Sequence, residues 1–114
     1  MPIQLMCSNG EITKADGIAN LIAAHRRSVA MVERLGKRLM EAEEVDATLI
    51  ARRLDAVMAE EAAMRRRAAS APVANVAEVK MKAAHFRQLM GHNWCEVDIE
   101  DLHELLRSFT TFQA

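Results

Sequence analysis

The chain has 114 residues, of which 51% are hydrophobic and 27% charged, and its formal net charge is -1. This length is that of one domain, and the apolar content excludes an intrinsically disordered chain. The small net charge excludes a strong overall attraction to nucleic acid or to anionic membranes. Only four Gly and two Pro, with no Tyr, favour helices over a β-rich fold.

The first twelve residues show no helical period, so we expect residues 1–12 to be irregular. They contain neither a basic segment nor a long apolar stretch, and a secretory signal is therefore not expected. No apolar run in the chain approaches the roughly 20 residues that span a bilayer. We expect a cytoplasmic protein.

The first helix is predicted over residues 14–44. Apolar side chains recur there at steps of four and three, which places them on one side of a helix. This stripe consists of Ile18, Ile22, His25, Val29, Val32, Gly36 and Leu39. Arg34 and Arg38 fall on the opposite side, so the helix is amphipathic.

A second helix is predicted over residues 46–69, with Asp46 as its N-cap and Val45 packed against Ile50. Its stripe consists of Ala47, Ile50, Leu54, Val57, Glu61, Met64 and Ala68. A break near residues 44–46 would make the two helices an antiparallel hairpin. The alternative is one continuous helix, because no Gly or Pro interrupts residues 37–71.

Two shorter helices are predicted after Pro72, which ends the second helix. Asn75 and Glu78 form a capping-box pattern at the start of a helix over residues 75–90. The apolar face of that helix is predicted as Val76, Val79, Ala83, Phe86 and Met90. A last helix is predicted over residues 98–109, with Ile99, Leu102, Leu106 and Phe109 on its apolar face. Residues 111–114 are expected to form a frayed tail.

Together these elements predict one all-α domain over residues 13–110, a small bundle of a long helical hairpin and two shorter helices. Isolated amphipathic helices are marginal in water, and the long stripe exceeds what the short helices cover. We therefore expect a homodimer whose long helices pack across a two-fold axis. The predicted seam, toward a second copy or another partner, consists of Ile18, Ile22, His25, Val29, Val32, Leu39, Ile50, Leu54, Val57 and Met64.

His25 is similar to the phosphoacceptor of histidine phosphotransfer domains, which carry a solvated imidazole on a helix in a chain of this size. That family's pattern has a Lys three residues after the His and a small residue next, whereas this chain has Ser28 and Val29. His25 also lies within the apolar stripe. The favoured interpretation is therefore a histidine in the core or at an interface.

Other ligand-type residues are scattered. His85 falls away from the predicted apolar face of its helix, so we expect it to be exposed and without a role. Zinc prefers His and Cys ligands, and the chain offers four such side chains, those of His92, Cys95, His103 and Cys7. Only His92 and Cys95 lie close together in the sequence. Whether these four bind a metal stays open, and we assign no metal or cofactor.

Arginines cluster at Arg26-Arg27, Arg52-Arg53 and residues 65–67. Acidic residues interrupt these clusters and aromatic residues for stacking on bases are few, so solvated helix faces are favoured over contact with nucleic acid. Trp94 with Glu96 and Asp98 could dock a basic partner, with the indole as an anchor. Equally, the acids could stabilise the start of the last helix.

Several segments resemble a pattern found in short, uncharacterised bacterial helical proteins, in which a long helix ends in a Pro-Ala turn before a Lys-bearing helix. The matching positions are residues 21–26, Leu54-Asp55, Glu60-Glu61, residues 71–76 and Lys82. The resemblance covers about residues 21–90. It implies a small cytoplasmic bacterial helical protein and carries neither an activity nor a site residue.

The regular stripes, without a nucleophile–base pair, a phosphate loop or a metal cluster in the sequence, predict a non-enzymatic interaction or regulatory protein. We expect it to act as a homo-oligomer and to bind another protein, with no nucleic acid, membrane or small-molecule substrate. The alternatives are phosphotransfer through His25 and a nucleic-acid-binding helical regulator that uses the arginine clusters.

Overall fold

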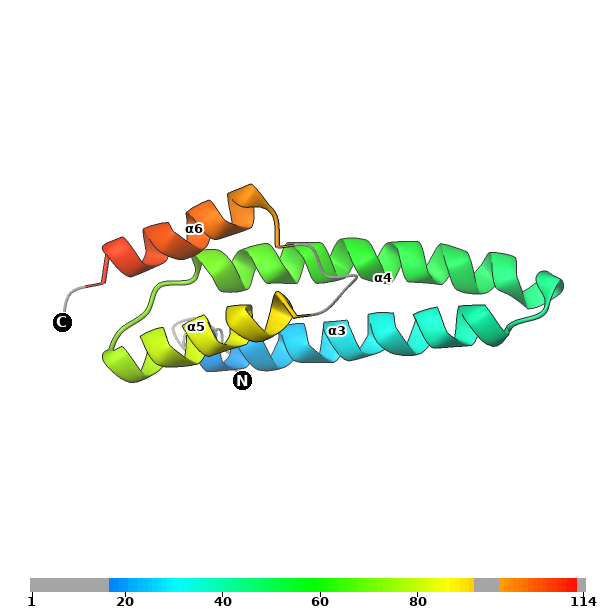
Figure 1. The fold of residues 1–114 in the computed structure, drawn as a ribbon, viewed down its shortest axis with the longest axis horizontal. Coiled ribbons are helices and arrows are strands. Elements are labelled where there is room, and N and C mark those ends of the chain that lie inside the picture. The colour runs from blue at the N-terminus through cyan, green and yellow to red at the C-terminus, as the bar shows by residue number, and fades with distance from the viewer. Residues whose placement is uncertain (1–16, 92–96, 113–114) are drawn as a thin grey trace, which may run out of the picture.

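The computed structural model describes residues 17–91 and 97–112, and within these ranges the chain is all-α. The helices are α3 (Ile18–Glu41), α4 (Glu44–Ser70), α5 (Val76–Leu89) and α6 (Ile99–Thr110) (Figure 1). α3 and α4 form an antiparallel hairpin, α5 lies beside α3, and α6 lies beside α4. The predicted helical bundle is therefore confirmed. Residues 1–12 and the predicted helix start at 14–16 lie outside the described residues.

The hairpin turn lies at Ala42 and Glu43, just before the predicted break, and the single continuous helix is excluded. Both residues have extended backbones, and Glu43 takes the N-cap position of α4 without a capping side-chain hydrogen bond. The prediction of Asp46 as the N-cap is wrong, because Asp46 lies inside the first turn of α4. Val45 is 84% exposed and so does not pack against Ile50 as expected.

The predicted starts of the two short helices are confirmed by their caps. The Asn75 side chain accepts a hydrogen bond from the Glu78 amide at 2.9 Å, whereas the Glu78 carboxylate accepts from the Ala74 amide at 2.8 Å instead of the Asn75 amide that a capping box requires. Asp98 and Asp101 form a reciprocal capping box, in which each side chain accepts from the backbone amide of the other. These bonds satisfy amides that have no partner within the helix. After α6, the amides of Thr111 and Phe112 still donate to α6 carbonyls, so these two residues of the predicted frayed tail are held.

Only part of the hairpin is covered by the short helices (Figure 1). We call residues 18–30 and 59–70 the basal half and residues 31–58 the distal half. The main core cluster consists of Val29, Ala68, Ala69, Phe86, Leu89 and Leu105, and a smaller one of Ile18, Ile22 and Ala71. Both clusters lie in the basal half and its covering segments. There the short helices complete the bundle.

Most residues of the predicted seam lie on the inner side of the hairpin of a single chain. Its N-terminal members Ile18, Ile22, His25, Val29 and Val32 are buried within a single chain. The remaining members are half-buried: Leu39, Ile50, Leu54, Val57 and Met64. A second copy is therefore not needed to bury the basal part of this stripe.

The predicted face of α5 is correct only for Phe86, which is buried, and for Val79, which is half-buried. The helix buries Lys82, His85, Phe86 and Leu89, whereas Val76 and Met90 are 53% and 56% exposed. The buried face rotates because the polar groups of Lys82 and His85 meet hydrogen-bond partners inside the bundle. The apolar side chains of Val76 and Met90, on the rest of this helix and at its end, therefore remain exposed to solvent.

The predicted face of α6 is correct only in part. Leu102 and Phe109 are half-buried against the core cluster, but Ile99 and Leu106 are 82% and 61% exposed. The buried residues are Asp101, Leu105 and Ser108. Across the described residues, no helix combines the length and the apolar character that a membrane crossing requires.

Candidate functional site

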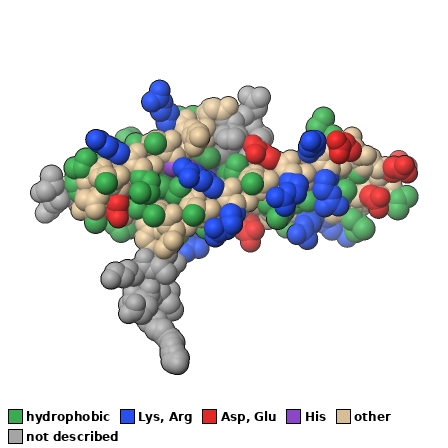
Figure 2. Space-filling view, turned by 90° about the horizontal axis from the view of Figure 1, so that it is seen from below, with side chains coloured by type: hydrophobic (Ala, Val, Ile, Leu, Met, Phe, Trp, Pro, Cys, Tyr) green, Lys and Arg blue, Asp and Glu red, His purple; other side chains and the backbone are tan. Residues whose placement is uncertain are grey.

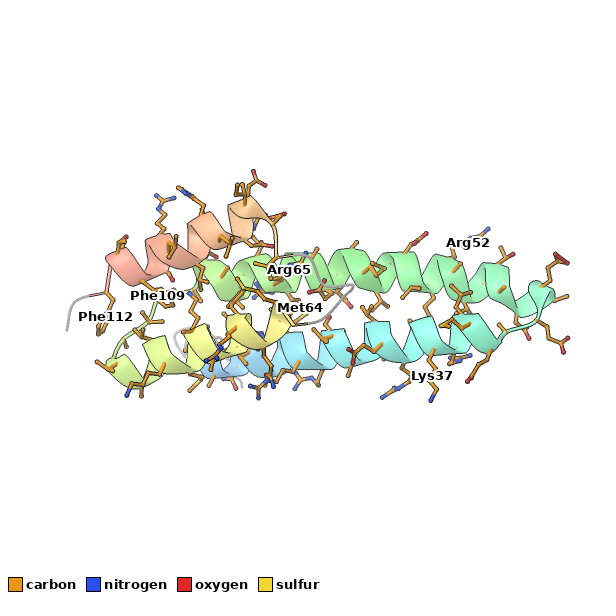
Figure 3. All side chains as sticks on the ribbon, viewed as in Figure 1. Lys37, Arg52, Met64, Arg65, Phe109 and Phe112 are labelled. Carbon is orange, nitrogen blue, oxygen red and sulfur yellow. The ribbon has the colours of Figure 1, made fainter. Side chains whose placement is uncertain are left out.

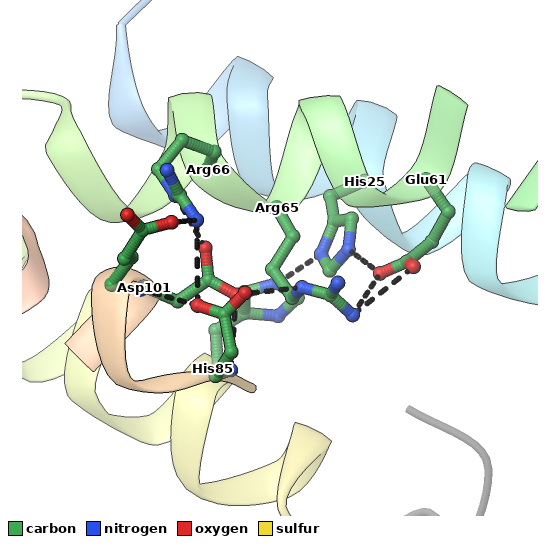
Figure 4. A network of polar contacts seen from close by, with 8 residues as sticks. His25, Glu61, Arg65, Arg66, His85 and Asp101 are labelled. Carbon is green, nitrogen blue, oxygen red and sulfur yellow. Dashed lines mark hydrogen bonds and ion pairs between the residues drawn. The ribbon is translucent and has the colours of Figure 1, made fainter. Parts of the chain in front are cut away.

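Five polar side chains are buried together in the basal half and come from all four described helices (Figure 4). They are His25 on α3, Glu61 and Arg65 on α4, His85 on α5 and Asp101 on α6. We call this set the buried network. Burial of polar groups is costly unless they are hydrogen-bonded, so their bonds decide how the helices fit together.

His25 links α4 and α5 through its two ring nitrogens. Its Nε2 lies 2.7 Å from Glu61 Oε2, and its Nδ1 lies 2.8 Å from His85 Nε2. A carboxylate only accepts hydrogen bonds, so His25 Nε2 is assigned as a donor. With one proton on each ring, His85 Nε2 then donates to His25 Nδ1. The remaining nitrogen, His85 Nδ1, is buried without a hydrogen-bond partner in the described part of the chain.

Arg65 carries the network from Glu61 to α6. Its Nη1 donates to both Glu61 carboxylate oxygens at 3.1 and 3.2 Å, and its Nε donates to Asp101 Oδ2 at 3.0 Å. The other Asp101 oxygen accepts from Arg66 Nε at 2.6 Å. Arg66 then reaches the exposed carboxylates of Asp98 and Glu100 at the surface. The network is thus continuous from His85 to the outer edge of α6.

The charges in the network follow from these contacts. Burial lowers the pKa of His85 to about 4, with smaller contributions from the neighbouring His25 and Arg26, so His85 is neutral at pH 7. The hydrogen bond that Arg66 donates to the Asp101 carboxylate raises the pKa of Arg66. The backbone hydrogen bond from Asp101 lowers the pKa of Asp98, and the nearby arginines act in the same direction.

Lys82 occupies a second buried polar position, between α5 and α6. Its ammonium group donates to the Ala71 carbonyl at 2.6 Å and to Ser108 Oγ at 2.7 Å, and it is 0% exposed. Burial lowers the pKa of Lys82 to about 8. A lysine of lowered pKa beside a serine is a pairing used to activate nucleophiles. Here the Ser108 hydroxyl donates to the Leu105 carbonyl and is itself buried. The two hydrogen bonds of Lys82 therefore serve to hold the end of α4 and α6 together through α5.

The buried network joins helices and does not line an open site. In the described part of the chain, the hydrogen bonds of both imidazoles run to each other and to Glu61. No group of three or more His, Cys, Asp or Glu among the described residues could hold a metal ion. The physical consequence of the network is positional: the His25–His85 hydrogen bond and the Arg65–Asp101 ion pair form only when α5 and α6 sit in one register on the hairpin.

Sequence reasoning placed His25 correctly but missed most of the network. The interpretation of His25 as a core histidine is confirmed, since it is 0% exposed with both nitrogens bonded. The prediction of an exposed His85 is wrong, because His85 is 2% exposed. A signal for it exists in Val79, Lys82, Phe86 and Leu89, which also follow helical spacing. The charge of Lys82 concealed that stripe.

The remaining predicted site residues are distributed as follows. Asp98 caps α6 and pairs with Arg66 at the surface, and His103 is exposed on α6. The predictions for Trp94, Glu96, His92, Cys95 and Cys7 fall outside the described residues. Of the arginine clusters, Arg65 and Arg66 are bound by carboxylates.

The distal half of the hairpin has a groove on each flank. The first, which we call the Gly36 groove, is lined by Val32, Glu33, Gly36, Lys37, Met40, Leu54 and Met58. The second, the Arg38 groove, is lined by Met31, Arg34, Leu35, Arg38, Leu49, Ile50 and Arg53. At 100° per residue the α3 residues of the two grooves lie on opposite sides of the helix. The first groove is mainly apolar, and the second carries three arginines.

Comparison of the chain with family models, curated proteins and solved structures gives no significant match in any of the three.

Proposed function

We propose that this chain is a non-enzymatic helical interaction protein that acts as a homo-oligomer through the distal half of its α3–α4 hairpin. The observation that carries the proposal is the apolar surface there. Met40 is 88% exposed and Met58 39%, and both line the Gly36 groove, whereas Leu49, 65% exposed, lies on the opposite flank. Large exposed apolar side chains gathered in one region are typical of protein-binding surfaces.

The packing of the hairpin supports the same conclusion. In the basal half, α5 and α6 cover the two long helices, and Val29 and Ala68 are almost fully buried. In the distal half the hairpin is a layer of two helices, and Ile50, Leu54 and Val57 stay half-buried. Each square ångström of apolar surface removed from water stabilises by about 25 cal/mol, so a covering partner gains free energy here.

The buried network suits such a role. It anchors α5 through the His25–His85 hydrogen bond and α6 through the Arg65–Asp101 ion pair, and these contacts favour a single arrangement of the helices. The distal half then projects from a rigid base. A preorganised surface loses less conformational entropy when a partner binds.

Self-association is tested by the mass in solution over a range of concentrations. We expect the wild type to have twice the 12.7 kDa of one chain. Met40→Asp should shift the protein to the monomer mass without unfolding it, because Met40 is 88% exposed in the single chain. Val76→Asp is the matched control, since Val76 is an exposed apolar residue on α5, and it should stay oligomeric. A wild type that is monomeric at every attainable concentration contradicts the proposal.

A nucleic-acid-binding regulator is a second candidate, favoured by one observation. Arg34, Arg38 and Arg53 come from two helices and line the same groove. Figure 2 shows Lys and Arg side chains gathered along one face of the distal hairpin. Binding of this kind weakens steeply with salt, because phosphate contacts release counterions. We expect a mobility shift at low salt that Arg38→Glu weakens; no shift at low salt would rule this candidate out.

A further inference from the structure

We propose that the Gly36 groove binds a second copy of this chain, with the two α3 helices antiparallel across a two-fold axis that passes close to Gly36. The proposal rests on the proposed function, and it adds the surface, the orientation and the contacts. Four observations support it: the continuity of the α3 stripe, the shape of the groove, its length and its charges.

The groove continues the surface on which α5 already packs. The stripe of α3 runs from Ile22 through His25 and Val29 beneath α5, and it continues as Val32, Gly36 and Met40. Figure 1 shows that α5 lies beside the basal half of α3 and does not extend along the distal half. The distal half thus lacks the helix that completes the basal half. A helix of a second copy would occupy the corresponding place.

The shape of the groove is complementary to itself. Val32, Gly36 and Met40 are spaced by four residues and form one ridge of the α3 surface. A two-fold axis at Gly36 places Val32 of each copy opposite Met40 of the other. A Cβ added at Gly36 would meet no atom within 4 Å, so the space above this residue is open. The two backbones can therefore approach closely at the axis, as small residues allow where helices cross.

The available length fits this arrangement. With the axis at Gly36, residue 29 of one copy lies opposite residue 43 of the other. Because α3 ends at Glu41, the helical overlap runs from residue 31 to residue 41 of each copy, which is roughly 15 Å along the axis. The turn of each hairpin then reaches the level of Val29, where the basal core begins. The second copy fills the distal half without displacing α5.

The charges at the groove select this flank and this orientation. Glu33 and Lys37 both line the groove, and the Lys37 side chain extends from α3 on the side away from α4 (Figure 3). Antiparallel packing about Gly36 brings Glu33 of one copy to within about 3 Å, measured along the helix axis, of Lys37 of the other. The symmetry creates two such pairs and also places the two Lys37 residues about 3 Å apart along the axis, so the Glu33 carboxylates offset the repulsion between the lysines and set the register more than they add affinity. On the opposite flank, Arg34, Arg38 and Arg53 would face the same three arginines of a second copy and repel them.

Cysteine cross-linking tests the position of the axis. In a Cys7→Ser/Cys95→Ser background, Gly36→Cys should give a covalent dimer under mild oxidation, because residues at a two-fold axis can meet disulfide geometry. Leu49→Cys is the matched control: Leu49 is 65% exposed on the opposite flank of the same distal half, and this variant should stay monomeric on a denaturing gel. A covalent dimer of Leu49→Cys without one of Gly36→Cys would place the dimer interface at the Arg38 groove and overturn the proposal.

A charge exchange provides a test that adds no cysteine at the axis. Glu33→Lys and Lys37→Glu should each raise the dimer dissociation constant severalfold, and the double variant should return it to near the wild-type value. A wild-type dimer that neither cross-links at Gly36→Cys nor responds to these changes would leave self-association standing and refute this surface. A monomeric wild type would instead refute the proposed function itself.

Discussion

Asp101→Ala should lower the free energy of unfolding by about 3–5 kcal/mol, which is the cost of breaking a buried ion pair by removing one partner. Asp101 is 1% exposed and accepts hydrogen bonds from Arg65, Arg66 and the Asp98 amide. The variant leaves a buried guanidinium without one of its carboxylates and removes half of the α6 capping box. Urea unfolding followed by circular dichroism measures the loss, which is a large part of the 5–15 kcal/mol of a typical domain.

Two further variants separate the buried pair from general effects of losing a carboxylate. Glu100, the residue before Asp101, makes an exposed ion pair with Arg66. Glu100→Ala removes this pair and should unfold at nearly the wild-type urea concentration. Asp101→Asn keeps an acceptor for Arg65 and for the Asp98 amide but removes the charge, and it should lose less stability than Asp101→Ala. If Asp101→Ala unfolds at the same urea concentration as the wild type, the described network does not hold α6.

Acidification should destabilise the fold between pH 6.5 and pH 4 through His85, by about 3 kcal/mol in total. Burial holds the pKa of His85 in the folded protein at about 4, below its ordinary 6.5. The unfolded chain therefore binds the proton first, so the His85 contribution is fully present above pH 6.5 and is lost as the pH falls toward 4. A second proton on His85 also places two donors on a ring that faces His25 and Arg26 from α3.

The contribution of His85 is obtained as a difference between variants, because acidification also acts on the other ionisable groups of the chain. His85→Gln keeps a donor toward His25 and does not titrate, so its stability should fall less than that of the wild type on going from pH 7 to pH 4. His103→Gln, on the exposed face of α6, should keep the wild-type pH dependence. Identical pH profiles for the wild type and His85→Gln would show that the His25–His85 contact is absent in solution.

The sequence was informative where a single physical signal dominates. The stripe of α3 is apolar apart from His25, and its burial in the basal half was predicted residue by residue. The caps at Asn75 and Asp98 were predicted because side-chain capping depends on residues three positions apart. The hairpin turn was placed slightly late, because it contains neither Gly nor Pro and no side-chain cap marks it.

The faces of α5 and α6 were not predictable in this way. Lys82, His85 and Asp101 are buried because each finds its partners on another element: Ala71 and Ser108 for Lys82, His25 for His85, Arg65 for Asp101. Read alone, each of these residues indicates a solvated face. Hydrophobic periodicity therefore misplaced most of the buried face of α5 and part of the buried face of α6.

What the sequence by itself determined is the all-α class, the two long amphipathic segments and the inward position of His25, since helix propensity and amphipathic spacing are local properties of the chain, whereas the structure decided that these segments form a hairpin. What only the tertiary structure decided is which polar groups lie inside and which part of the hairpin stays uncovered. A buried charge is tolerated only when partners from distant segments meet it with good geometry, and spacing along one helix carries no information about those partners.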